Sequence, residues 1–203
     1  MDPLPGPTWP HAPAPADPME LFAAWFRQAQ EREVPGPRAM VLATVAPTGL
    51  PSQRVVILRD FSTNGLVFVS SAMSRKGVEL ARNAQAGAHF HWPALQRQIS
   101  VAGAVEVLTP QVSDALFQER SPRAKAVAVG SEQSAPLLDA GDLHRHVEAL
   151  AAHGSNLPRP ATQVGYVLKP TAVEFWAGND DELHNRLRFD QLNGRWNSVL
   201  LQP

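Results

Sequence analysis

The chain of 203 residues contains no cysteine, which excludes disulfides, thiolate metal sites and cysteine nucleophiles. The absence of cysteine also fits a cytoplasmic protein. Because there is no run of 18 apolar residues and no charged-then-apolar leader, we expect neither a membrane span nor classical secretion. With a formal net charge of −1, the chain has no general attraction for nucleic acid or membrane surfaces. Any site for an anion must therefore be local.

Several familiar motifs are missing as well. The sequence has no nucleophile elbow, no G-x-G-x-x-G fingerprint and no Walker sequence. His89 and His91 share one face of a predicted strand, but no third ligand stands nearby, so we interpret them as half-buried structural histidines. His144 and His146 are two residues apart on a predicted helix and cannot face one ligand together. We therefore predict no metal site.

The first part of the chain is rich in proline. Prolines at positions 3, 5, 7, 10, 13, 15 and 18 predict an extended, flexible arm over residues 1–16. Asp17 and Pro18 then have the pattern of a helix cap followed by a proline at the first helical position. The helix is predicted to bury an apolar stripe and to end before Pro35-Gly36-Pro37. The stripe consists of Phe22, Trp25, Phe26 and Ala29.

Strand patterns dominate from residue 39 onward. Five strands are predicted at Ala39–Val45, Gln53–Arg59, Gly65–Ser71, Ala86–Trp92 and Gln98–Leu108. Shorter ones are predicted at Gln163–Leu168, Ala172–Trp176, Asn185–Phe189 and Arg195–Leu201, the last two joined by a tight hairpin at Asn193-Gly194. Helices are predicted at Thr109–Glu119 and at Asp142–Ala152, the second ended by His153-Gly154, with a loop over residues 124–140. Short connections favour an antiparallel meander closed into a barrel, so we predict one domain over residues 17–203, mostly β with flanking helices.

The turn Ser74-Arg75-Lys76-Gly77 is the strongest candidate for a binding site. It lies between a strand-like and a helix-like run, where Ser74 would cap the helix and free N–H groups would face an anion. Only three of the 18 Lys and Arg residues are lysines, and one of them, Lys76, stands in this turn. Its two cations suit a phosphate dianion. The alternative is an ordinary helix cap with two solvated charges.

Other polar residues could join this turn. Arg54 and Arg59 border a buried strand and are expected to point to opposite faces, because they are five residues apart. The amide of Gln98 and the pair Gln133-Ser134 would suit a heterocycle with carbonyl and N–H edges. An aromatic and basic group near the C-terminus could form a pocket wall and consists of Trp176, His184 and Arg186.

Taken in order, these motifs resemble the flavin-dependent pyridoxine (pyridoxamine) 5′-phosphate oxidase family. The resemblance extends from about Asp17 to the C-terminus. It is carried by Arg54–Arg59, Gly65–Phe68, Ser74–Lys76, Arg97-Gln98, Gln133-Ser134, Glu174–Trp176 and Leu183–Arg186. The resemblance implies an antiparallel, Greek-key-like split β-barrel that binds FMN. It also implies a homodimer with one FMN per subunit at the subunit interface.

The resemblance also implies roles for the matching residues of the cofactor site. The FMN phosphate would be bound by Arg54, Arg75 and Lys76 with help from Ser70, while Gln98 would address the isoalloxazine edge. The other subunit would complete the site with Gln133, Ser134, Trp176 and Arg186. The full FMN-binding set implied is Arg54, Val55, Val56, Ile57, Arg59, Val69, Ser70, Ser74, Arg75, Lys76, Gln98, Gln133, Ser134, Trp176 and Arg186.

The implied substrate site departs from that of the vitamin B6 oxidases. Where those enzymes hold the substrate phosphate with a lysine, a tyrosine, an arginine and a serine, this chain has Arg59, Leu116, Arg120 and Ala124. The arginine that usually begins their Arg-Leu-His motif is replaced by Glu182. His184 and Arg186 keep the catalytic positions and would orient the substrate or the flavin. The implied substrate-binding set is Arg59, Leu116, Arg120, Glu182 and His184.

These departures resemble a branch of the family that acts in phenazine biosynthesis, as do the proline-rich arm that leads into Asp17-Pro18-Met19, the segment Leu157–Pro160 and the ending Leu183–Phe189. The resemblance implies an FMN-dependent oxidase for a small aromatic, carboxylated substrate. Reduced phenazine carboxylic acid precursors would be oxidised with O2 as acceptor, which gives hydrogen peroxide. The alternatives are a true pyridoxine/pyridoxamine 5′-phosphate oxidase that forms pyridoxal 5′-phosphate, a non-catalytic flavin-binding protein, and a barrel that uses a deazaflavin.

Overall fold

The fold is given by a computed structural model that describes residues 14–152 and 156–203. Most of the predicted arm over residues 1–16, and the predicted helix end at His153-Gly154, lie outside this part of the chain. The helices are α1 Pro18–Glu31, α2 Arg75–Arg82, α3 Pro110–Gln118, α4 Pro122–Gly130 and α5 Ala140–Ala152, with a short 3-10 turn at Pro93–Leu95. The strands are β1 Ala39–Val45, β2 Pro51–Ile57, β3 Asp60–Ser62, β4 Gly65–Ser71, β5 Gln85–Trp92, β6 Arg97–Val107, β7 Gln163–Ala177, β8 Asn185–Leu192 and β9 Arg195–Leu201. None of the helices in the described ranges is both long and apolar enough to cross a membrane.

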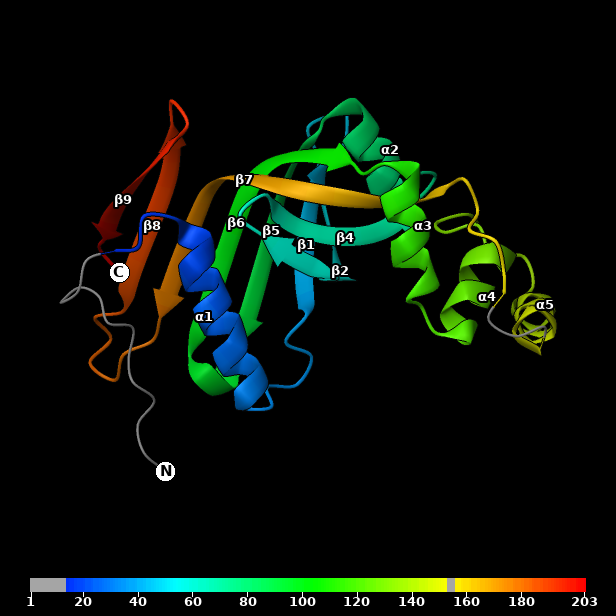
Figure 1. The fold of residues 1–203 in the computed structure, drawn as a ribbon, viewed down its shortest axis with the longest axis horizontal. Coiled ribbons are helices and arrows are strands. Elements are labelled where there is room, and N and C mark those ends of the chain that lie inside the picture. Colours follow the sequence, from blue (N-terminus) through cyan, green and yellow to red (C-terminus); the bar gives the residue numbers. More distant parts are fainter. Residues whose placement is uncertain (1–13, 153–155) are drawn as a thin grey trace.

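The first helix, α1, begins where the sequence predicts. The backbone N–H of Met19 donates to Asp17 Oδ1 at 2.8 Å, and a proline occupies the first turn. The predicted apolar stripe is buried: the ring of Phe22 lies 5.3 Å from that of Phe90, and the ring of Trp25 lies 5.2 Å from that of Phe175. In Figure 1 the helix lies across the sheet. It therefore covers the core that the inner face of the sheet provides.

The strands pair antiparallel throughout, in the order β2-β1-β5-β6-β7-β4-β3, with β8 on β7 and β9 on β8. The predicted simple meander was wrong, because β4 pairs with β7 and leaves β5 to pair with β1. This non-sequential, Greek-key-like order curls the sheet around the buried side chains (Figure 1). The prediction of a mostly β protein with flanking helices is confirmed.

The curled sheet closes at one end and stays open at the other. Directly after β2, the N–H of Arg59 donates to the carbonyl oxygen of Val67 in β4 at 2.8 Å. Further along the same two strands, Arg54 and Ser70 line a cavity. This opening between β2 and β4, which lie near opposite ends of the strand order, is the split of a split β-barrel, as the resemblance implies.

One long strand, β7, replaces two predicted ones. It runs through Pro170, which has no N–H to donate. The β6–β7 register shifts between Ala102 and Gly103, so Pro170 lies beside a bulge, where a missing donor is tolerated. The two backbones approach so closely here that a Cβ added at Gly103 would lie 1.9 Å from the carbonyl oxygen of Lys169. The strand curves over the sheet in Figure 1, which shapes the barrel.

Residues 124–140 were predicted as a loop, but most of α4 lies there. Ser121 caps the helix, since its Oγ accepts the N–H of Ala124 at 3.2 Å, and Pro122 occupies the first turn. Small residues on every side gave this helix no apolar stripe to recognise. The next helix, α5, packs closely on it, with Leu150 approaching Gly130. Both helices lie at the end of the molecule opposite α1 in Figure 1.

Candidate functional site

A polar pocket of about 490 Å³ opens at the split of the barrel. Its wall is built by β2, by the end of β4, by the start of α2 and by the loop after α4. It brings together most of the residues that the resemblance assigned to the cofactor. The lining residues are Ser52, Gln53, Arg54, Val55, Val56, Ile57, Arg59, Val69, Ser70, Arg75, Lys76, Arg120, Gln133 and Ser134.

The turn into α2 is fixed by hydrogen bonds within the protein. Ser74 caps the helix as predicted, because its Oγ accepts the N–H of Gly77 at 3.3 Å. A glycine is required at position 77, since an added Cβ would lie 2.4 Å from the carbonyl oxygen of Ala72. The N–H of Arg75 donates to Ser134 Oγ at 3.2 Å. Two of the N–H groups that were expected to be free for an anion thus have protein partners, and the attraction for an anion rests mainly on side chains.

Lys76 is the most buried cation of the pocket, with 5% of its surface exposed. Its ammonium donates to Ser70 Oγ at 3.1 Å and to Ser74 Oγ at 3.2 Å. No carboxylate of the described residues forms an ion pair with it. Burial lowers its pKa, as does the charge of Arg54, while Glu79 raises it. Its hydrogen-bond partners are thus two hydroxyl groups, which leave the positive charge of the ammonium without a directly bonded anion.

Arg54 and Arg75 flank the lysine and share one carboxylate. Arg54 Nη2 lies 3.4 Å from Glu79 Oε2, and Arg75 Nε donates to Glu79 Oε1 at 2.9 Å. Burial is the main reason that the pKa of Arg54 is lowered. Burial alone would raise the pKa of Glu79, but hydrogen bonds from Ser52, Thr44 and Arg75 and the charge of Arg75 lower it from 4.5 to about 2. The carboxylate is thus ionised at neutral pH.

The loop after α4 reaches the pocket within the same chain. Gln133 Oε1 accepts from Ser70 Oγ at 3.3 Å and from the N–H of Ser71 at 3.4 Å. Ser134, which adopts a left-handed backbone with φ 76, accepts from Arg75 N–H. The expectation that this pair comes from the other subunit is corrected, because the loop already lies against α2 of its own chain.

Two further arginines face the same pocket. Arg59 lies beyond the end of β2, so strand alternation does not separate it from Arg54, and both line the cavity. Arg120 follows α3 and donates from Nη1 to Gln163 Oε1 at 3.3 Å, while its Nε is buried without a hydrogen-bond partner in the described part of the chain. Burial and the neighbouring Arg59 lower the pKa of Arg120. Leu116 is buried one turn earlier and lines a different groove.

The remaining predicted residues form a second group on another part of the sheet. The register aligns His91, Gln98, Trp176 and Arg186 in one row across β5, β6, β7 and β8. Arg186 is held by Glu174, whose Oε1 accepts from Nε at 2.9 Å and from Nη2 at 2.7 Å.

Two predicted substrate residues lie beside this row. The ring of His184 lies 4.8 Å from that of Trp176, and its Nδ1 accepts the N–H of Asn179 at 3.2 Å. Glu182 lies on the exposed loop before it, with φ 64. Both are thus placed with Trp176 and away from the pocket at the barrel split.

The two groups do not meet within one chain. In the β4–β7 ladder Ser70 pairs with Val164, and Trp176 lies twelve residues further along β7. At about 3.3 Å per residue, this is roughly 40 Å of strand. The chain therefore carries two half-sites, the cation pocket at the barrel split and the aromatic row on β6–β8.

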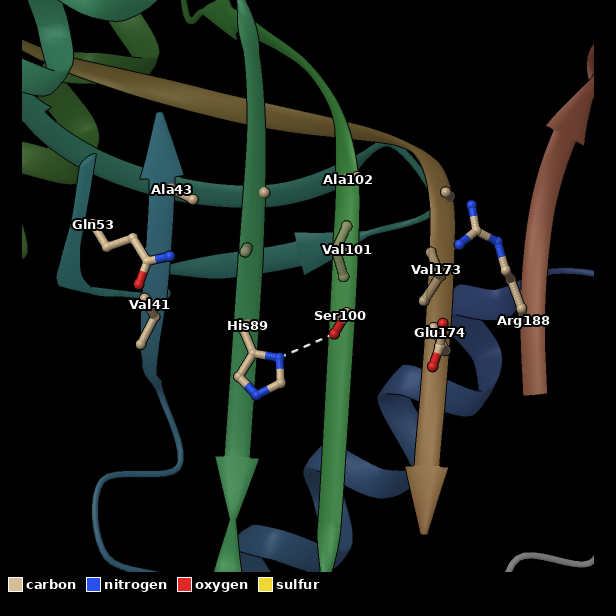
Figure 2. Close-up of a pocket in the computed structure, with 13 residues that line it drawn as sticks. Val41, Ala43, Gln53, His89, Ser100, Val101, Ala102, Val173, Glu174 and Arg188 are labelled. Atoms are coloured by element: carbon tan, nitrogen blue, oxygen red, sulfur yellow. Dashed lines mark hydrogen bonds between the residues drawn. The ribbon is translucent and has the colours of Figure 1, made fainter. Parts of the chain in front are cut away.

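Between the two half-sites the outer face of the sheet is hollowed. Figure 2 shows this second pocket, of about 480 Å³, floored by small residues of β1, β5, β6 and β7. His89 Nδ1 and Ser100 Oγ share a hydrogen bond of 3.0 Å across the neighbouring strands. Burial, and then the charge of His91, lower the pKa of His89. His89 is half-buried and hydrogen-bonded, as predicted for a structural histidine, whereas the same prediction was wrong for His91, which is exposed.

Residues 26–177 match the family model described as pyridoxamine 5′-phosphate oxidase, and residues 164–203 match the pyridoxine 5′-phosphate oxidase C-terminal dimerisation region. A pyridoxine/pyridoxamine 5′-phosphate oxidase of Herminiimonas arsenicoxydans is 40% identical over 93% of this chain and 90% of that protein. One of Novosphingobium aromaticivorans is 42% identical over 93% of this chain and 94% of that protein.

Solved structures give a matching result. The crystal structure of PhzG from Burkholderia lata 383, in complex with tetrahydrophenazine-1-carboxylic acid, is 35% identical with a TM-score of 0.91, covering 93% of this chain and 94% of that one. A pyridoxamine 5′-phosphate oxidase-related, FMN-binding protein from Nostoc punctiforme, 19% identical with a TM-score of 0.73, supports the fold alone. Since the family model spans most of the chain and the relatives match along nearly all of it, the chain belongs to the pyridoxamine 5′-phosphate oxidase family, a family of oxidoreductases.

Proposed function

We propose that the protein is an FMN-dependent oxidase of phenazine biosynthesis, which oxidises reduced, carboxylated tricyclic precursors with O2 as acceptor. The observation that carries this proposal is the pair Arg59 and Arg120, which lies beside the three-cation cradle of Arg54, Arg75 and Lys76 in one pocket. The cradle suits the phosphate of a cofactor, and the pair suits the carboxylate of a substrate. The similarity to PhzG, whose structure contains a tetrahydrophenazine carboxylic acid, supports the same substrate class.

The donors of the cradle fit the phosphate of FMN. Lys76 is buried with hydroxyl partners, and a phosphate oxygen would give its ammonium the anion that burial otherwise denies it. Arg54 and Arg75 would neutralise the remaining charge from either side. The pocket also has apolar wall residues that would exclude water from the ring, namely Val55, Val56, Ile57 and Val69. When bound, FMN supplies a ring that takes two electrons from a substrate and passes them to O2.

A second copy of the chain would complete this site. The row of Gln98, Trp176 and Arg186 lies too far from the pocket to reach the same ligand within one chain. The C-terminal strands that carry Trp176 and Arg186 fall within the matched dimerisation region. Val55 and Ile57, 63% and 46% exposed beside the pocket, offer apolar surface for such a contact. We therefore infer a homodimer in which each site combines the pocket of one subunit with the row of the other.

The substrate end of the pocket favours a carboxylate over a phosphate. Of the four positions that hold the substrate phosphate in the vitamin B6 oxidases, only Arg59 and Arg120 line the pocket here; Leu116 lines a different groove and, like Ala124, has no hydroxyl group. The planar guanidinium groups of Arg59 and Arg120 match the two oxygens of a carboxylate. Glu182 would reach the site only from the partner subunit and would keep a dianionic phosphate away by repulsion.

The proposed oxidation requires no acid or base group of the protein. A dihydro or tetrahydro ring becomes more aromatic by losing two electrons and two protons, and O2 takes up both to give hydrogen peroxide. The residues have to orient the ring against the cofactor and shield it from water. Because His184 Nδ1 accepts a backbone N–H, the neutral ring carries its proton on Nε2 and can donate it in a hydrogen bond to the substrate. Arg186 lies on β8, which begins directly after His184, and would support the substrate ring from the same partner subunit.

A second candidate is a pyridoxine/pyridoxamine 5′-phosphate oxidase. It is favoured by the names of relatives about 40% identical to the chain. Arg59 and Arg120 could also meet a phosphate, because arginine binds either anion in a bidentate way. The two candidates differ in the substrate that reduces the bound flavin, and a non-catalytic carrier would be reduced by neither.

The test is an anaerobic visible spectrum of the holoprotein. We expect the flavin absorbance to bleach when a tetrahydrophenazine carboxylic acid is added and to persist when pyridoxine 5′-phosphate is added. Bleaching by pyridoxine 5′-phosphate alone would establish the second candidate and refute the first. Bleaching by dithionite but by neither substrate would support the carrier.

A further inference from the structure

Glu79 lies behind the cation cradle and not in the pocket that the cradle lines. Its side chain is buried, with 4% of the residue surface exposed. Oε2 accepts from Thr44 Oγ1 at 2.5 Å and from Ser52 Oγ at 2.6 Å, and Oε1 accepts from Arg75 Nε at 2.9 Å. The carboxylate thus joins α2 to the first two strands of the sheet.

The contacts of Glu79 hold both arginines of the cradle. Arg54 donates from Nη2 to Ser52 Oγ at 2.5 Å and from Nη1 to Thr44 Oγ1 at 2.6 Å, and these are the two hydroxyls that Glu79 also binds. Arg75 has an exposed side chain (58%), so its bond to Glu79 is what fixes the direction of its guanidinium. One carboxylate therefore sets the positions of two phosphate-binding groups.

The same carboxylate also sets the charge of the cradle. Arg54, Arg75 and Lys76 carry three positive charges, and Glu79 removes one of them. Two positive units remain to meet the dianion of a phosphate monoester, which carries a charge of about −1.5 to −2 at neutral pH. The cradle is thereby matched to one phosphate, without an excess of buried positive charge.

We propose that Glu79 is a positioning residue of the cofactor site, which orients Arg54 and Arg75 and matches the cradle to a dianionic phosphate. This inference rests on the proposed use of FMN. It predicts that Glu79 acts on the phosphate end of the cofactor and leaves the flavin ring unaffected. It also predicts that the action passes in large part through Arg75.

The experiment is a titration of the apoprotein with FMN and with riboflavin, which lacks the phosphate. Glu79→Gln keeps the size and one acceptor oxygen but removes the charge. We expect it to weaken FMN binding about tenfold, as the loss of a charged hydrogen bond predicts, and to leave riboflavin binding unchanged. In an Arg75→Ala background, the same substitution should weaken FMN binding by about threefold or less, because its main partner is already gone. The matched control is Glu148→Gln, which removes a carboxylate paired with Arg123 on an exposed surface.

Each other outcome is distinct. Equal weakening of FMN and riboflavin, or a full tenfold loss in the Arg75→Ala background, would show a general structural role and overturn the proposal. Tighter FMN binding by Glu79→Gln would make the carboxylate a repulsive charge, which also overturns it. If the wild-type protein binds FMN no better than riboflavin, the phosphate assignment fails by itself, whatever Glu79 does.

Discussion

Lys76 is the residue that most favours the proposed phosphate site over a purely structural turn. A solvated helix cap would leave its ammonium in water, yet it is 5% exposed and bound to two serine hydroxyls. Burying an ammonium without a counter-charge costs several kcal/mol. The neighbouring charge of Arg54 adds to that cost, and the charge of Glu79 offsets part of it. An anion bound in the pocket would offset this cost. An ordinary helix cap gives no reason for burying the ammonium.

Replacing Arg75 and Lys76 together by alanine is therefore expected to remove FMN from the protein. Two charge-assisted hydrogen bonds would be lost, each of about 1.5–3 kcal/mol, so affinity should fall at least about 100-fold. Flavin fluorescence titration of the apoprotein measures this, and circular dichroism checks that the variant is folded. Normal FMN affinity in the double variant would contradict the phosphate assignment.

The sequence reveals the members of this cradle more readily than their partners. Ser74, Arg75 and Lys76 stand together in one turn, where a motif can be recognised. In the sequence alone, Glu79 is not distinguished from any other charged residue on a short helix. Its role depends on Thr44 and Ser52, which strand pairing brings to it from 27 or more positions away. Such a contact is set by the sheet and has no local signal.

At the scale of elements, prediction succeeds where the pattern is strong on its own. The strands β1, β4 and β9 have the predicted bounds, because apolar runs beside clear turn residues define them. The helix α4 was missed because its small residues show no apolar face, and β7 was divided because Pro170 normally ends a strand. The order of the sheet was also missed, since no single segment records which strand will be its neighbour.

The bulge between β6 and β7 gives a testable case at this scale. Gly103→Ala would place a methyl group against the backbone of Lys169, so the two strands must separate. We expect a loss of about 2–3 kcal/mol of stability, as for an overpacked site, and a clearly lower melting temperature. Gly87→Ala is the matched control, because its added Cβ would meet nothing closer than 3.8 Å. Equal melting temperatures for the two variants would refute this account of the bulge.

At the scale of the whole molecule, the main feature is that one chain does not bring the cation pocket and the aromatic row together. The resemblance named the cation pocket and the aromatic row as parts of one site, and they lie at distant places on a curved sheet. Sequence order gives no measure of this separation. Gln133 was expected to come from the partner subunit, but it contacts the pocket of the chain to which it belongs. Gln98 and Trp176, in contrast, lie far from that pocket. The fold shows that the two groups lie apart in one chain, and the proposed dimeric site rests on this separation.

This division predicts complementation between two defective variants. Arg75→Ala/Lys76→Ala damages the pocket, and Gln98→Ala/Arg186→Ala damages the row, so neither homodimer should bind FMN. When the two are unfolded and refolded as an equal mixture, half of the dimers combine both chains, and one of their two sites has an intact pocket and an intact row. Bound FMN should then return to about a quarter of the wild-type level. The control is a mixture of the pocket variant with Arg54→Ala, which damages the same half of the site and should recover no bound FMN. Recovery of FMN binding in this control, or no recovery in the first mixture, would mean that each chain builds its site alone.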